Sequence, residues 1–179
     1  MSDHLPFLGE RVLLRDVTLD DADLLDEWNR DMEVGGFNDF GPREPIPREP
    51  LASGPLRNDR NGSLIVELLE TGEPIGTVGW RRILVYGPSP FSDAWQIGIE
   101  IVAHARGRGL GTEAQRLLAA YLFAATDLNR VEASTDIENV AEQRSLEKAG
   151  YRREGVARGS QFRGGSYHDL VYYSRLRSD

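Results

Sequence analysis

The sequence has no cysteine among its 179 residues and only three histidines. Without cysteine, disulfides, thiol nucleophiles and thiolate metal sites are excluded, and the composition is compatible with a reducing compartment. Because His4, His104 and His168 are scattered along the chain, a metal site built from histidine is not expected. The sequence thus predicts no bound metal.

Basic residues and long apolar runs are also scarce. The 21 Lys and Arg residues are outnumbered by 29 Asp and Glu, giving a net charge of -8 at pH 7. This balance argues against nucleic acid as the default partner and favours cationic or amine-bearing partners. No apolar run reaches the roughly 18 residues that span a bilayer, and no secretory signal is visible. We therefore expect a cytoplasmic protein without a membrane partner.

What the chain does contain is enough apolar material for one core. Hydrophobic residues make up 40% of the sequence, and alternating strand-like and helix-like segments predict one mixed α/β domain over residues 1–179. Strands are expected at 11–17, 63–69, 75–85, 94–102 and 130–134, with closing strands through 167–176. Helices are expected after Thr18, after the glycine-rich segment 106–112 and over 138–149.

Two local features qualify this pattern. Thr112-Glu113-Ala114-Gln115 has the form of a capping box, which predicts a helix start there. Residues 35–60 contain Pro42, Pro45, Pro47, Pro50 and Pro55, so a proline-rich loop is expected within the domain. Because long loops in compact domains are often functional, we favour a role for it on the substrate side.

The segment Arg106-Gly107-Arg108-Gly109-Leu110-Gly111-Thr112 lies between an expected strand and an expected helix. A helix N-terminus binds phosphate readily, and glycine allows the backbone to approach the anion closely. A Walker A loop is excluded because no lysine follows these glycines, and a dinucleotide fingerprint is excluded because Thr112 stands where its third glycine would fall. The alternative is an ordinary strand-to-helix turn.

Two motifs carry a family resemblance. The R-x-x-G-x-G pattern from Arg106 to Gly111 resembles the pyrophosphate-binding motif of the GNAT superfamily of CoA-dependent N-acetyltransferases. The run from Asn139 to Gly155 resembles a signature of its ribosomal-protein alanine acetyltransferase-like (RimJ/RimL) branch. The resemblance covers the second half of the chain, from Ile97 onward, and the strand and helix near the N-terminus fit the start of that branch.

The resemblance implies a single-domain GNAT fold: a central, mostly antiparallel, splayed mixed sheet flanked by helices. It further implies that acetyl-CoA enters the splay between strands 94–102 and 130–134 like an added strand. The residues expected to hold it are Ile99, Ile101, Arg106, Gly107, Arg108, Gly109, Leu110, Gly111, Thr112, Asn139, Arg144 and Lys148. For Arg144 and Lys148, a solvated basic helix face is an equal alternative.

Acetyl transfer needs a group to take the proton of the amine. Glu100 is the first candidate, because it lies on the strand beside the thioester and faces away from the stripe formed by Ile97, Ile99 and Ile101. A solvent-facing glutamate is the alternative. Asp93, Glu67 and His168 are weaker candidates, and water could also carry the proton.

The group that protonates the departing thiolate is less evident. Many GNAT enzymes have tyrosine where this chain has Leu146, and the branch often has serine where Glu142 stands, so both usual candidates are missing. An ionised Glu142 would repel a thiolate, so it is protonated, points elsewhere, or leaves the task to another group. Ser145, Tyr172 and Tyr173 are the candidates that remain.

The resemblance implies an acetyl-CoA-dependent N-acetyltransferase acting on a primary amine, by direct attack in a ternary complex. The amine is either a protein N-terminus or a small molecule such as an antibiotic or metabolite, and Trp28, Trp80 and Trp95 could line its pocket, with core packing as their alternative. A non-catalytic CoA-binding sensor or interaction module is the competing function. The acceptor, the size of the acyl group and a possible homodimer are left open by the sequence.

Overall fold

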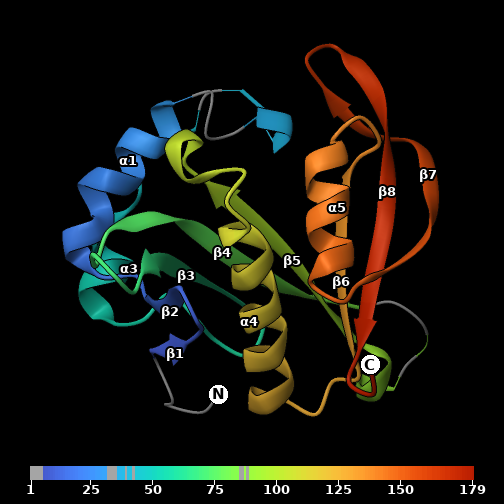
Figure 1. Ribbon diagram of the computed structural model, residues 1–179, viewed down its shortest axis with the longest axis horizontal. Helices are drawn as coiled ribbons and strands as arrows, with labels where there is room; N and C mark the ends of the chain where they lie inside the picture. The colour runs from blue at the N-terminus through green and yellow to red at the C-terminus, as the bar shows by residue number, and fades with distance from the viewer. Residues whose placement is uncertain (1–5, 32–35, 39, 42, 85–86, 88) are drawn as a thin grey trace.

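The computed structural model describes residues 6–31, 36–38, 40–41, 43–84, 87 and 89–179 (Figure 1). Within these residues, eight strands form one sheet. In spatial order they are β1 (Phe7–Leu8), β2 (Val12–Asp16), β3 (Asn61–Leu68), β4 (Pro74–Ile83), β5 (Ala94–Ile101), β6 (Arg130–Asp136), β8 (Ser166–Leu176) and β7 (Arg152–Arg163). Every neighbouring pair is antiparallel except β5 and β6, which are parallel. The predicted mixed, mostly antiparallel sheet is confirmed.

Four α-helices accompany the sheet in the described part of the chain: α1 (Ala22–Arg30), α3 (Arg48–Ser53), α4 (Leu110–Ala125) and α5 (Val140–Lys148). In Figure 1, α4 and α5 lie side by side in front of the sheet, and α1 and α3 lie together at the edge formed by the first strands. None of the described helices is both long and apolar enough to cross a membrane.

The core is divided by the sheet. Leu64 and Val66 of β3 belong to the large apolar cluster under α4 and α5, whereas Ile65 belongs to a smaller cluster with Leu25 of α1 and Leu51 of α3. Because successive residues of a strand point to opposite faces, helices cover both sides of the sheet. Helix α4 packs against the sheet through an apolar face, of which four residues are almost completely buried: Ala114, Leu118, Tyr121 and Leu122.

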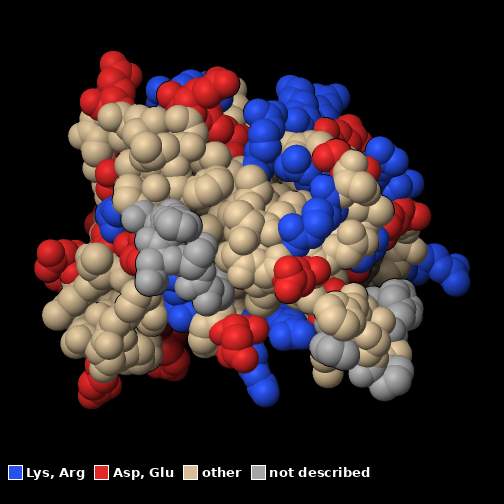
Figure 2. Space-filling model, turned by 90° about the horizontal axis from the view of Figure 1, so that it is seen from below, with Lys and Arg blue, Asp and Glu red and all other residues tan. Residues whose placement is uncertain are grey.

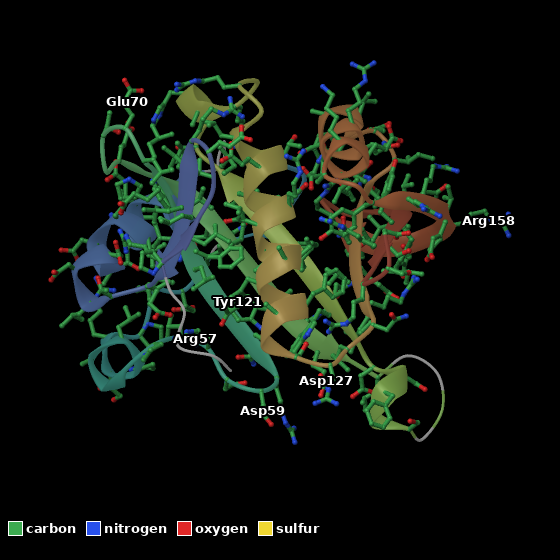
Figure 3. All side chains as sticks on the ribbon, turned by 60° about the horizontal axis from the view of Figure 1, so that its bottom comes forward. Arg57, Asp59, Glu70, Tyr121, Asp127 and Arg158 are labelled. Atoms are coloured by element: carbon green, nitrogen blue, oxygen red, sulfur yellow. The ribbon has the colours of Figure 1, made fainter. Side chains whose placement is uncertain are left out.

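Aromatic rings fill the space between α4 and the sheet. Tyr121, labelled in Figure 3, packs edge-on against Trp80 of β4 and against Phe7, with ring centroids 5.7 and 6.2 Å apart. Arg57 reaches the same region and donates to the Tyr121 hydroxyl at 3.4 Å. Trp80 is therefore part of the core, with 4% of its surface exposed.

The structure corrects the expected start of α4. The helix begins at Leu110, after Gly109 in the left-handed conformation (φ +77°), rather than at Thr112. The expected capping box of Thr112 and Gln115 is not formed, because both residues lie inside the helix and the Gln115 side chain bonds to Ser145 and Glu142. Glu113 also bonds outside the helix. Its Oε1 accepts from the backbone N–H groups of Glu10 and Arg11 at 2.7 and 2.8 Å, and its Oε2 accepts from the Arg11 side chain at 3.1 Å. Burial raises the pKa of Glu113, but these donors outweigh it, so the pKa is lowered.

The proline-rich segment 35–60 contains the short helix α3 in place of uninterrupted loop. Pro50 is its third residue, a position where a missing N–H costs no intrahelical bond. The helix is held by Leu51, which is buried in the smaller core cluster. Tertiary packing thus stabilises a helix of six residues that its sequence alone would not.

Candidate active site

The site begins where β5 and β6 separate. Their parallel pairing comprises only Trp95 with Val131 and Gln96 with Glu132, after which the strands diverge toward the top of Figure 1, between α4 and α5. Beyond this pairing, residues 97–101 of β5 and 133–135 of β6 border a cavity of about 1100 Å³. The sheet is therefore splayed at the predicted pair of strands, and the opening is large enough for a cofactor-sized ligand.

The N-terminus of α4 faces this cavity. Gly107 and Gly109 both adopt positive φ (+72° and +77°), which turns the chain directly into the helix. The N–H of Glu113 bonds to the carbonyl of Gly109 at 3.2 Å, so the amides of Leu110, Gly111 and Thr112 precede the intrahelical ladder. Unpaired amides and the helix dipole together make this end of the cavity suited to an anion.

Basic side chains border the same end. Arg106, Arg144 and Lys148 line the cavity, and Arg106 Nε donates to the Ile101 carbonyl at 2.7 Å. Figure 2 shows that acidic and basic side chains are interspersed over one face of the molecule, so the net negative charge is not gathered there in one patch. The positive charge of Arg106, Arg144 and Lys148 thus belongs to the lining of this cavity.

The cavity reaches both faces of the sheet. Ala133 of β6 lies opposite Tyr173 of β8, and Ser134 lies opposite Tyr172. Directly opposed residues share a face, so Tyr173, buried in the core under α5, marks one face and Tyr172 the other. Ala133, Ser134 and Tyr172 all line the cavity. A ligand on the α4 and α5 side can thus meet one arriving from the opposite side.

Glu100 lies on the face of β5 opposite the isoleucines and is engaged by Arg43. The guanidinium donates to both carboxylate oxygens, at 2.7 Å from Nη2 to Oε1 and 3.0 Å from Nη1 to Oε2. Arg43 belongs to the proline-rich segment, and two further residues of that segment, Gly36 and Phe37, line the cavity. The segment therefore borders the side of the cavity that α4 and α5 do not cover.

Glu142 lies in the first turn of α5, half-buried in the cavity wall. Its Oε1 accepts a hydrogen bond from Nε2 of Gln115 on α4. Burial raises the pKa of Glu142 to about 7, although the hydrogen bond from Gln115 acts in the opposite direction. Near neutral pH a large fraction of this carboxyl is therefore uncharged.

Asn139 caps α5. Its Oδ1 accepts from the N–H of Glu142 at 3.2 Å, and its Nδ2 donates to Thr135 Oγ1 of β6 at 3.0 Å. An amide group has a second N–H and a second lone pair, so these bonds leave capacity for a ligand.

Most of the residues predicted from the sequence come together around the cavity. The predicted residues that line it are Trp80, Ile99, Glu100, Ile101, Arg106, Gly107, Gly109, Leu110, Gly111, Thr112, Asn139, Arg144, Ser145, Lys148 and Tyr172. Their predicted roles remain predictions, since lining a cavity does not by itself assign a task.

Three predicted residues lie elsewhere. Trp95 is 1% exposed in the core, where its Nε1 donates to Thr126 at 3.1 Å, and Trp28 packs against both core clusters. Core packing therefore accounts for both tryptophans. Arg108 does not line the cavity either; its carbonyl accepts from Arg11 Nη1 at 2.9 Å.

The weaker candidates for a base lie outside the cavity lining, and two of them are held in ion pairs. Asp93 pairs with Arg82 at 2.6 Å and Glu67 with Arg15 at 2.6 Å. His168 lies 3.3 Å from Asp136, beside the hairpin between β7 and β8.

The sequence did not point to several side chains of the site, among them Gln115 and Phe37, which line the cavity, and Arg43, which pairs with Glu100. Gln115 is a polar residue within the apolar pattern of α4, and this was the signal that could have identified it. The structure buries it almost completely. Phe37, which lines the cavity, and Arg43, which reaches Glu100, gave no such signal, because both arrive there through contacts between distant parts of the chain.

Comparison with known proteins gives one family and several relatives. The domain described as "Acetyltransferase (GNAT) domain" matches residues 11–152. The chain is 28% identical over 176 residues to the uncharacterized N-acetyltransferase p20 of Bacillus licheniformis, covering 95% of each chain. It is 37% identical over 84 residues to the putative ribosomal N-acetyltransferase YdaF of Bacillus subtilis, covering 47% of this chain and 46% of that one.

Solved structures share the fold. The spermidine N-acetyltransferase of Vibrio cholerae, crystallised with CoA and spermine, superposes with a TM-score of 0.78 at 19% identity, over 95% of this chain and 98% of that one. At this identity the likeness concerns the fold alone.

Proposed function

The chain belongs to the acetyltransferase (GNAT) family, and we propose that it transfers an acetyl group from acetyl-CoA to the nitrogen of a primary amine. The acceptor is either a protein N-terminus or a small amine, and the transfer is a direct attack within a ternary complex. One observation carries the proposal: the opening between β5 and β6 lies directly in front of the unpaired amides of α4.

The residues present fit acetyl-CoA as donor. The amides of Leu110, Gly111 and Thr112 would bind its pyrophosphate, while Arg106 adds positive charge. The exposed backbone of β5 around Ile99 and Ile101 would pair with its amide-containing arm, as an added strand does. Arg144, Lys148 and Asn139 border the same cavity and complete the set of groups proposed to hold the donor.

The bound donor supplies an acetyl thioester, and the chain supplies positioning and proton transfer. Glu100 is proposed to take the proton of the attacking amine, because it faces the side of the cavity away from α4. For this, the amine must displace Arg43 from the carboxylate, since both Glu100 oxygens are occupied by the guanidinium. Tyr172 lies on the same face and is a second candidate for contact with the acceptor.

The Arg43–Glu100 pair also suggests the charge of the acceptor. A carboxylate that binds a guanidinium in the free protein is suited to bind the ammonium form of an incoming amine. The fold is shared with a spermidine N-acetyltransferase crystallised with spermine. A cationic small amine is therefore our preferred acceptor, ahead of a protein N-terminus.

The first test is calorimetric titration of the purified protein with acetyl-CoA, ADP and adenosine. We expect acetyl-CoA to bind much more tightly than ADP, because ADP lacks the arm that would pair with β5. No binding of acetyl-CoA would mean that the glycine segment is only a structural turn, and the enzymatic proposal would fall.

A second candidate function is a CoA-binding module without catalysis, which the replacement of the usual serine by Glu142 favours. The two functions differ in turnover. A panel of primary amines, polyamines and peptides with free N-termini, assayed for release of CoA thiol, separates them. The catalytic proposal requires that at least one amine be acetylated, whereas the module would bind acetyl-CoA and acetylate none.

A further inference from the structure

Four polar side chains form a continuous hydrogen-bonded row between α4 and α5, along the wall of the cavity. Thr112 Oγ1 lies 2.9 Å from Ser145 Oγ, Ser145 Oγ lies 3.3 Å from Gln115 Oε1, and Gln115 Nε2 bonds to Glu142 Oε1. All four side chains line the cavity. The row ends on a carboxyl group.

The protons in this row have one consistent direction. The Oε1 of Gln115 can only accept, so the bond from Ser145 uses the single hydroxyl proton of Ser145. Ser145 must then accept from Thr112, and Gln115 must donate to Glu142. Every donor therefore points toward Glu142 Oε1, which acts as an acceptor.

This direction decides which side chain has a proton to give. The hydroxyl proton of Ser145 is already bonded to Gln115, so Ser145 is a poor donor to a ligand. The carboxyl proton of Glu142 resides on Oε2, because Oε1 is the acceptor, and among the described residues no other side chain bonds to this carboxyl. Glu142 is thus the member of the row with an available proton.

The surroundings of Glu142 favour its neutral form. Gln115, Ser145 and Thr112 are uncharged, and the nearby Tyr151 hydroxyl is buried without a hydrogen-bond partner among the described residues. The charged side chains that line the same cavity near α5 are Arg144 and Lys148, both exposed. Burial raises the pKa of Glu142 to about 7, which suits a group that exchanges a proton near neutral pH.

We propose that neutral Glu142 is the catalytic residue that protonates the departing sulfur, with Gln115 and Ser145 as the residues that position it. This inference rests on the proposed acetyl transfer. As the bond between the amine nitrogen and the acetyl carbon forms, the carbon–sulfur bond breaks and its electron pair stays on sulfur. Sulfur takes the proton from Oε2, and Glu142, left as a carboxylate, recovers a proton from water. The proton of the amine leaves separately, to Glu100 or water.

The test is the pH dependence of kcat, measured with a weakly basic amine that is already unprotonated at about pH 6. With such an acceptor, a fall in kcat above about pH 7 reports the loss of the Glu142 proton. We expect this fall in the wild type. In Glu142→Gln we expect kcat to be reduced ~10²-fold below pH 7, with no such fall and with acetyl-CoA affinity almost unchanged.

The matched control is Glu147→Gln. Glu147 lies on the same helix, is exposed and does not line the cavity, so this variant makes the same chemical change away from the site. We expect it to retain the wild-type rate and pH profile. A Glu142→Gln variant with the wild-type rate and the wild-type fall would overturn the assignment.

Two further variants test the positioning residues. Gln115→Leu removes the donor that lowers the pKa of Glu142, so the fall in kcat should move to higher pH. Ser145→Ala should reduce kcat only a few-fold. If Ser145→Ala instead abolished activity while Glu142→Gln did not, Ser145 would be the proton donor and the proposal would be wrong.

The outcomes also separate this inference from the function on which it rests. A wild-type protein that binds acetyl-CoA but acetylates no amine at any pH overturns the proposed function, and this inference with it. A wild-type protein that acetylates an amine while Glu142→Gln is unaffected overturns only the role of Glu142.

Discussion

The two walls of the cavity each present a glutamate, and the two glutamates have opposite surroundings. Glu100, on the β5 wall, is bonded through both oxygens to the guanidinium of Arg43. The carboxyl of Glu142, on the α5 wall, accepts a hydrogen bond from the uncharged amide of Gln115, and burial raises its pKa to about 7. One carboxyl is paired with a cation and the other is poised to lose a proton.

This difference shows that neighbours rather than residue type determine what a carboxyl group can do. A charged partner keeps a carboxylate ready to bind a cation or accept a proton. Burial beside an uncharged partner raises the pKa of a carboxyl group, so that it holds a proton that it can donate. In acetyl transfer to an amine, one group accepts the proton of the amine nitrogen and another gives a proton to the departing sulfur.

The largest effect is expected from a substitution that fills the space between the β5 and α5 walls of the cavity. A Cβ on Gly111 would lie 3.5 Å from Ile101 and 3.6 Å from Ile99, so alanine fits there and a larger side chain would enter the cavity. Gly111→Leu should weaken acetyl-CoA binding roughly 10³-fold, about 4 kcal/mol, by displacing at least two charge-assisted hydrogen bonds.

Calorimetry measures this loss, with thermal unfolding to verify the fold and Gly111→Ala as the matched control. Unchanged acetyl-CoA affinity in Gly111→Leu would mean that the donor does not bind between these walls.

The proton on the α5 wall also affects stability. The pKa of Glu142 is about 7 in the folded protein and 4.5 in an exposed glutamate, so folding favours the protonated form. That stabilisation is complete below pH 4.5 and is lost as the pH rises through about 7. Glutamine has no proton to lose. Glu142→Gln should therefore gain up to about 3 kcal/mol relative to wild type between pH 4.5 and pH 8.

Urea unfolding at both pH values measures this difference, with Glu147→Gln as the control. A difference that is independent of pH would show that Glu142 titrates as an ordinary exposed glutamate.

On the β5 wall, Glu100→Gln removes the proposed base and keeps the shape of the side chain. We expect kcat to fall about 10²-fold, since general base catalysis contributes roughly that much. Acetyl-CoA affinity should not change, because Glu100 faces away from the isoleucines that border the donor. Steady-state kinetics together with calorimetry test both statements, and a variant with the full rate would exclude Glu100 as the base.

The smallest effect is expected from Arg43→Ala, which leaves Glu100 without its cation. A cationic acceptor would no longer compete with the guanidinium, so its KM should fall by a few-fold, or less than about 1 kcal/mol. Arg158, which points outward from β7 in Figure 3, provides the control Arg158→Ala. A higher KM in Arg43→Ala would instead indicate that Arg43 helps to hold the acceptor.

The sequence predicted the elements that surround the cavity better than it predicted the partners and the protonation of the two glutamates. The strand around Ile99, the glycine segment and the α5 motif are local patterns, and the structure brings them together around one cavity. Arg43, which engages Glu100, lies 57 residues away from it and carries no local signal. The sequence identified Glu142 as unusual but left its protonation open, because burial depends on the packing of α5 against α4.

Local patterns failed where a tertiary contact outweighed them. Thr112 and Gln115 have capping-box chemistry, yet the left-handed Gly109 starts the helix earlier, and Gln115 bonds to Ser145 and Glu142 on α5. The tryptophans show the same limit. Large aromatic residues suit a binding pocket and a core equally well, and only the packing distinguished Trp80, which borders the cavity, from Trp95, which does not.

The contact between Arg11 and Glu113 has a consequence for how this chain can evolve. Arg11 bonds to Glu113 and to the Arg108 carbonyl, and thereby joins the first strands to the glycine segment about one hundred residues later. A substitution of Arg11 removes one donor from the buried Glu113 carboxylate together with the bond to the Arg108 carbonyl, and a substitution of Glu113 removes the carboxylate partner of Arg11. Positions 11 and 113 should therefore vary together across relatives, as coupled sites that constrain the glycine segment from a distance.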